Sequence, residues 1–109
     1  MEYQTRQWLE EALFDLLATK KSLHNISIAE LSDHAQIARR TFYRYYHSKE
    51  QVLTNYLDRL IQDYIIELQT EKLTNFEDLV NFFFRYWSQY TESLKILQNA
   101  NLLVLILQR

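Results

Sequence analysis

The sequence contains no glycine, no proline and no cysteine. Without glycine, a glycine-rich phosphate-binding loop is excluded, and tight β-hairpins lose their favoured turn residues. Without cysteine, there are no disulfides, no thiolate metal ligands and no cysteine nucleophile. Without proline, no helical segment is broken by a residue that lacks a backbone N–H. Together these absences favour an all-α fold.

Other signals are missing as well. His24, His34 and His47 lack the spacing of zinc-binding histidines, so we expect no metal site and no cofactor. The polar stretch around His34 and His47 offers no acid to orient a catalytic base, so we expect no catalytic residue and no enzyme. No apolar run approaches the roughly 18 residues that span a bilayer, and the first residues lack the apolar segment of a signal peptide. We therefore expect a cytoplasmic protein.

The chain is long enough for one ordinary domain, and 48% of its 109 residues are hydrophobic, which is sufficient for a core. Apolar residues recur with the period of helices that bury one face. This periodicity predicts helices near 5–20, 27–35, 39–45, 49–70, 75–90 and 91–98, with a last helix after residue 101.

Residues 27–49 carry the most specific pattern in the sequence. Ser27 is a good N-cap for a short helix, and Glu30 stands at the position that completes a capping box. A second short helix is predicted from Arg39. No acid occurs between Asp33 and Glu50, although the net charge of the chain is −2. Positive charge and tyrosine hydroxyls on a short exposed helix are suited to a phosphate backbone and a major groove.

The segment IAELSDHAQIARRTFYRYYHSKEQVL resembles the DNA-binding segment of the TetR (tetracycline repressor) family of bacterial regulators. The positions that match the family pattern are Ser27, Ile28, Leu31, Ala35, Ile37, Thr41, Phe42, Tyr43, Tyr45, Tyr46, Ser48, Lys49, Glu50 and Val52. The sequence departs from the pattern at Gln36, where glycine is usual, at Ala38, where serine or asparagine is usual, and at Arg40, where glycine is common. Gln36 implies either a left-handed residue, with a strain on the order of 1 kcal/mol, or a turn of different geometry.

The resemblance implies a domain organisation and a function. Residues 1–57 would form a DNA-binding domain with a helix-turn-helix motif at 27–46, and residues 58–109 part of a helical ligand-binding and dimerisation domain. The expected function is sequence-specific transcriptional regulation by a homodimer on a palindromic operator, as a repressor released by a small-molecule effector. A helical protein-interaction module that does not bind DNA is the alternative, and the acidic pI of about 5.9 leaves room for it.

The resemblance also implies roles for individual residues. Arg39, Arg40 and Thr41 are expected to face base edges, because the reading helix presents its start to the major groove. The residues expected to contact phosphates are Ser27, Tyr43, Arg44, Tyr45 and Lys49.

The second half of the chain is rich in aromatic and apolar residues. Five aromatic residues are candidates for effector contact, although an aromatic stripe is also typical of an ordinary core; they are Tyr64, Phe83, Tyr86, Trp87 and Tyr90. Relatives in the resembled family continue for several more helices. We therefore expect the apolar run LLVLIL at 102–107 to lack a partner helix and to drive association of a shortened chain.

Overall fold

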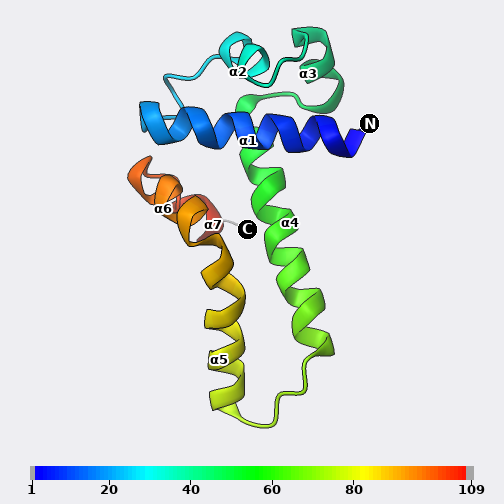
Figure 1. Cartoon of the computed structure of the whole chain (residues 1–109), viewed down its shortest axis with the longest axis vertical. Helices are drawn as coiled ribbons and strands as arrows, with labels where there is room; N and C mark the ends of the chain where they lie inside the picture. The colour runs from blue at the N-terminus through cyan, green and yellow to red at the C-terminus, as the bar shows by residue number, and fades with distance from the viewer. Residues whose placement is uncertain (1, 108–109) are drawn as a thin grey trace.

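The computed structural model describes residues 2–107, which are all-α and contain no strand (Figure 1). The expected fold class is therefore confirmed. In chain order the helices are α1 (Glu2–Lys20), α2 (Ile28–His34), α3 (Arg39–Tyr45), α4 (Lys49–Thr70), α5 (Phe76–Trp87), the 3₁₀ turn η1 (Ser88–Tyr90), α6 (Thr91–Asn99) and α7 (Val104–Leu107). The predicted helix at 75–90 thus ends at Trp87, and its last three residues tighten into the 3₁₀ turn.

Side-chain caps fix the starts of three helices. Ser27 Oγ accepts from the Glu30 N–H at 3.0 Å, Ser48 Oγ from the Gln51 N–H at 3.1 Å, and Asn75 Oδ1 from the Asp78 N–H at 2.8 Å. Each of these bonds satisfies a donor that has no partner inside its helix.

The expected capping box at Ser27 is formed only in part. The Glu30 carboxylate pairs with Lys20 Nζ at 2.7 Å, so it bridges α2 to the end of α1. The equivalent side chain at the start of α4, Gln51, accepts from the N–H of His47 at 2.6 Å, one residue before the cap.

The helices form an elongated molecule of 49 × 30 × 21 Å. In Figure 1, α1 lies across the molecule with α2 and α3 on one side of it. Helix α4 leaves from the other side and runs away from α1, and α5 returns beside it. Helix α6 then packs against α1. The short helices of the motif are therefore held at one end of the molecule.

One core holds the helices of that end together. It contains Leu9, Leu13 and Leu17 of α1, and it also contains Phe42 of α3, which is fully buried. Leu97 of α6 belongs to the same cluster and is fully buried too. The core therefore contains residues of α6 as well as residues of α1 to α4.

The expectation that the apolar run at 102–107 lacks a partner is wrong. Leu102, Leu103, Leu105 and Ile106 are half-buried and pack against the core. The chain reverses after α6 because Asn101 takes a left-handed conformation (φ 61°), while the Leu102 N–H donates to the Leu97 carbonyl at 2.8 Å. This pair of features is a Schellman motif, and it turns the run back onto its own subunit.

Two negative findings apply to residues 2–107. No helix there is long and apolar enough to cross a bilayer. No group of three or more His, Asp or Glu side chains there is placed to hold a metal ion.

Candidate nucleic-acid interface

The turn between α2 and α3 is built around Gln36, which is left-handed with φ 61°. The Gln36 N–H donates to the Asp33 carbonyl and the Ile37 N–H to the Ser32 carbonyl, both at 3.0 Å. These are the two bonds of a Schellman motif, in which glycine is the usual left-handed residue. Of the two expected possibilities, the structure therefore has the left-handed residue in ordinary turn geometry.

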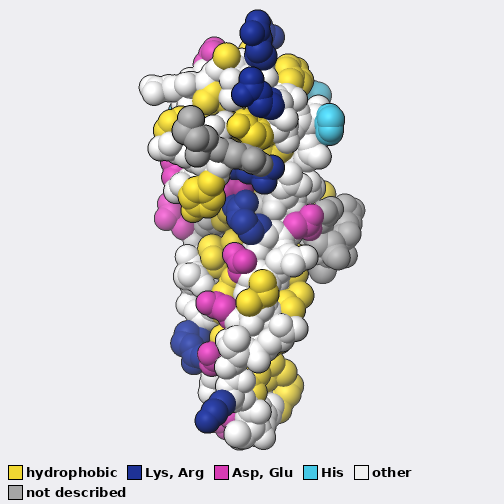
Figure 2. Space-filling view, turned by 90° about the vertical axis from the view of Figure 1, so that its right-hand side faces the viewer, with side chains coloured by type: hydrophobic (Ala, Val, Ile, Leu, Met, Phe, Trp, Pro, Cys, Tyr) yellow, Lys and Arg dark blue, Asp and Glu magenta, His cyan; other side chains and the backbone are white. Residues whose placement is uncertain are grey.

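Helix α3 is anchored by Phe42 and turns its opposite side to solvent. Arg39, Arg40, Tyr43 and Arg44 are all exposed. Within residues 2–107, no ion pair involves any of these three arginines. Figure 2 shows Lys and Arg side chains following one another down the upper end of the molecule, whereas most Asp and Glu side chains lie lower on that face. Helix α3 thus presents uncompensated positive charge on an acidic chain.

An open cleft of about 440 Å³ lies beside this helix, between the starts of α2 and α4. Arg39 and Tyr43, one turn apart on α3, form one side of it. Its remaining lining comes from Ser27, Ile28, Ala29, His47, Ser48, Lys49 and Glu50. The positive end of the 22-residue helix α4 also meets the cleft, and such a helix end attracts anions. The Glu50 carboxylate opposes that attraction. The net positive charge of the cleft therefore depends on the cationic side chains of Arg39 and Lys49.

Lys49 occupies the cleft in a way that its sequence position does not reveal. Its Nζ donates to the Ile26 carbonyl at 2.7 Å and to the His24 carbonyl at 3.4 Å. An ammonium group has three donors, so one remains for another acceptor. Lys49 therefore joins α4 to the loop before α2, and contact with a phosphate stays a prediction.

Two of the expected contact residues lie at the inner edge of α3. Thr41 and Tyr45 are half-buried, and the Tyr45 ring packs against the core. The structure therefore brings Ser27, Arg39, Tyr43 and Lys49 together in the cleft, places Arg40 and Arg44 on the exposed side of α3, and leaves Thr41 and Tyr45 nearer the core.

His47 is a cleft residue that sequence reasoning did not select as a site residue. It is exposed and directly precedes the Ser48 cap, and its N–H is held by Gln51. Its position immediately before a capped helix and after a basic helix is the signal that would have found it.

Comparison with known proteins identifies this end of the molecule. Residues 16–55, from the end of α1 into α4, match the profile of the family described as bacterial regulatory proteins, tetR family. This segment is therefore similar to that family. The chain is also 34% identical over 65 residues to an uncharacterized HTH-type transcriptional regulator, YxbF, of Bacillus subtilis (strain 168). That match covers 60% of this chain but only 17% of the regulator. No solved structure matches the chain.

The expected effector residues divide between two sides of the α4–α5 pair. Tyr64, Phe83 and Trp87 line an apolar pocket of about 520 Å³ that α6 and Ile106 help to close. Tyr86 and Tyr90 lie outside that lining. The Tyr86 hydroxyl is buried and donates to the Leu60 carbonyl at 3.3 Å, and burial raises the pKa of this phenol above its ordinary value. Tyr86 is thus occupied in joining α5 to α4.

Proposed function

We propose that this chain binds double-stranded DNA as the reading part of a transcriptional regulator. The observation that carries the proposal is the exposed face of α3, on which Arg39, Arg40 and Arg44 project with no ion pair to another residue in the described range. Clustered cations create a local positive potential, and a phosphate backbone supplies the counter-charge that the described residues do not provide.

The cleft and the exposed face suggest different roles. Arg39, Tyr43, Ser27 and the remaining donor of Lys49 converge on one cleft, which is suited to a phosphate group. Arg40 and Arg44, one turn apart, lie on the exposed side of α3. Because Arg40 is at the start of the helix, it is placed for a guanine edge in the major groove. Thr41 and Tyr45, being half-buried, would contribute through the position of α3 more than through direct contact.

Regulation by a small molecule would use the apolar pocket between α4, α5 and α6. The apolar pocket has a volume in the range of small-molecule sites, so we assign it to a hydrophobic effector whose binding between α4, α5 and α6 shifts α4. A homodimer on a palindromic operator would place two α3 helices about 34 Å apart, one turn of DNA. If the shift of α4 changes the distance between the two α3 helices, the effector would release a cytoplasmic repressor from its operator.

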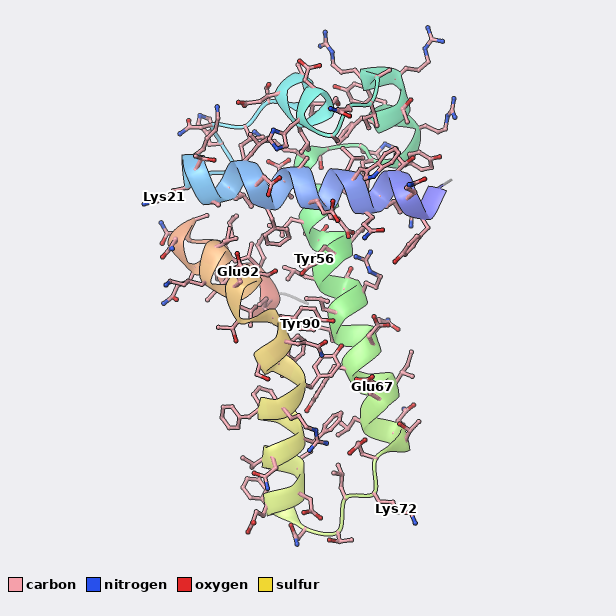
Figure 3. The ribbon with its side chains drawn as sticks, in the orientation of Figure 1. Lys21, Tyr56, Glu67, Lys72, Tyr90 and Glu92 are labelled. Carbon is pink, nitrogen blue, oxygen red and sulfur yellow. The ribbon has the colours of Figure 1, made fainter. Side chains whose placement is uncertain are left out.

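The experiment is a titration of fluorescent duplex DNA with the protein at several salt concentrations. Binding to random duplex should weaken steeply with salt, and Arg39→Ala should make the slope of log K against log salt shallower by about 0.9, one phosphate contact. Arg40→Ala should cost about 1–3 kcal/mol on a selected duplex and relax the preference at one base pair. Lys72→Ala is the matched control, since Lys72 is exposed on the connection between α4 and α5, far from α3 (Figure 3).

The rival function is a helical interaction module that uses no DNA. Such a module would show no salt-dependent binding to duplex, and substitutions at Arg39 and Lys72 would then be equivalent. If Arg40→Ala changes only the salt dependence, the assignment of Arg40 to a base is wrong although DNA binding stands.

A further inference from the structure

The backbone around His47 is held in place by the two helices that it connects. His47 is the single residue between Tyr46, the C-cap of α3, and Ser48, the N-cap of α4. The Tyr46 N–H donates to the Phe42 carbonyl at 3.0 Å, and the His47 N–H donates to Gln51 Oε1 at 2.6 Å. The imidazole therefore projects from a fixed point, although it lies at the surface.

The side chain of His47 is exposed and lines the cleft of about 440 Å³ beside α3. Among residues 2–107, its ring makes no hydrogen bond and no ion pair, since the bond to Gln51 uses the backbone N–H. Both ring nitrogens are therefore available to a molecule that enters the cleft.

The charged groups that face this ring come from α3 and α4. Arg39 of α3 and Lys49 of α4 are cationic, Glu50 of α4 is anionic, and Tyr43 is the other titratable side chain in the lining. Residues 27–29, at the start of α2, complete the wall without a charge. Of the side-chain types in this lining, only an imidazole ordinarily changes its charge between about pH 6 and about pH 8.

The other two histidines of the chain lie elsewhere. His34 stands at the end of α2, where its Nε2 is 3.3 Å from Asp15 Oδ2 of α1. His24 is exposed in the loop before α2. Among the described residues that line the cleft, His47 is the only histidine. A proton gained at His24 or His34 would therefore not face an anion held in the cleft.

We propose that His47 is a proton-dependent phosphate contact, whose protonated imidazole donates to an oxygen of the DNA backbone held beside Arg39 and Lys49. An anion favours the charged form of a nearby imidazole, so binding of duplex takes up a proton from solvent at this ring. DNA affinity therefore rises as pH falls through the range in which histidine titrates. The inference rests on the proposed DNA-binding function and adds to it a contact residue and a dependence on pH.

The test is a titration of fluorescent random duplex over a series of salt concentrations, at about pH 6 and at about pH 8. At the lower pH the parent should bind roughly three- to tenfold more tightly, and the slope of log K against log salt should steepen by up to about 0.9, one phosphate contact. His47→Gln should lose most of this difference, because an amide keeps a donor but carries no charge. His24→Gln, the same substitution at an exposed histidine outside the cleft lining, is the matched control and should behave as the parent.

A variant with a permanent charge gives the converse test. His47→Lys should bind at about pH 8 as tightly as the parent binds at about pH 6, and it should gain little on acidification. Calorimetry in two buffers with different ionisation enthalpies should show that the parent takes up more protons on binding duplex than His47→Gln does.

The outcomes separate this inference from the function on which it rests. If the parent and His47→Gln bind duplex with the same dependence on pH, or if His47→Lys gains as much as the parent on acidification, the role given to His47 is wrong although DNA binding stands. If the parent and all three variants fail to bind duplex at either pH, the proposed function itself fails, and this inference fails with it.

Discussion

Lys49 Nζ lies 2.7 Å from the carbonyl oxygen of Ile26, which precedes it by 23 residues. This contact joins the first residue of α4 to the loop that leads into the Ser27 cap of α2. A cation at a helix N-terminus is disfavoured by the helix dipole. Here the carbonyl oxygens of Ile26 and His24 offset that cost. Lys49 therefore keeps the starts of α2 and α4 close together beside α3.

The first prediction follows from this contact. Lys49→Met should lower the free energy of unfolding by about 1–2 kcal/mol, because two carbonyls lose a charged donor. Urea denaturation followed by circular dichroism measures the change. Lys72→Met, at an exposed lysine between α4 and α5, is the control and should change stability by less than about 0.5 kcal/mol. Equal midpoints for Lys49→Met and the parent would show that Lys49 serves only an external phosphate.

The starts of the helices could be predicted from the sequence, whereas the contacts of Lys49 could not. The starts of α2, α4 and α5 were predictable to within about a residue, because Ser27, Ser48 and Asn75 are local caps whose partners lie three residues on. The partners of Lys49 could not be predicted in the same way. They are distant along the chain and come close only when α4 packs under the α1–α2 loop.

The exposed face of α3 was predictable only in part, because it too depends on contacts between residues that are distant in the sequence. Helix α3 has seven residues, and a stretch of two turns leaves its orientation to tertiary packing. Phe42 is fully buried on one side of it. The half-burial of Thr41 and Tyr45 depends on tertiary packing, in which α3 lies against α2 and Tyr45 against the common core, and no local pattern encodes it.

The second prediction concerns the left-handed Gln36. Gln36→Gly should raise the free energy of unfolding by about 0.5–1 kcal/mol, because glycine adopts φ 61° without the steric cost of a Cβ. Thermal or urea denaturation provides the measurement. Gln62→Gly, in the exposed interior of α4, is the matched substitution and should lower stability by about 1 kcal/mol. If both substitutions destabilise equally, Gln36 is held by side-chain contacts that outweigh its backbone strain.

The third prediction follows from the position of the apolar run after α6. Leu103→Asp together with Leu105→Asp should destabilise the fold by several kcal/mol, because both side chains pack against the core and would bring charge into it. Val104→Asp, at a side chain that is 53% exposed in the same segment, should have little effect. Denaturation midpoints of the two proteins check this. A double variant that stays as stable as the parent but associates less would restore the run as an intermolecular surface.

The last prediction concerns the start of α5 and its dependence on pH. Asp78 Oδ2 accepts from the Thr74 hydroxyl at 2.7 Å and from the Thr74 N–H at 3.0 Å, and these bonds lower the pKa of Asp78 below its ordinary value of 3.8. A carboxyl whose pKa is lower in the folded protein stabilises it above the unfolded pKa, and that contribution is lost as pH falls through the folded pKa. The turn at 74–78 should therefore loosen below about pH 4, while α3 and its surroundings do not respond to this group.

Amide chemical shifts of Thr74 and Asp78, followed by NMR from neutral to acidic pH, measure that loosening. Asp78→Asn should remove the acid response of these amides, because the amide side chain keeps an acceptor but does not titrate in this range. Glu77→Gln, also in the first turn of α5, is the matched control and should leave the response as in the parent, since no hydrogen bond of Thr74 involves Glu77 in the described range. An acid response that persists in Asp78→Asn would mean that another carboxyl governs this turn, and the stabilising role given to the Thr74–Asp78 pair would then be wrong.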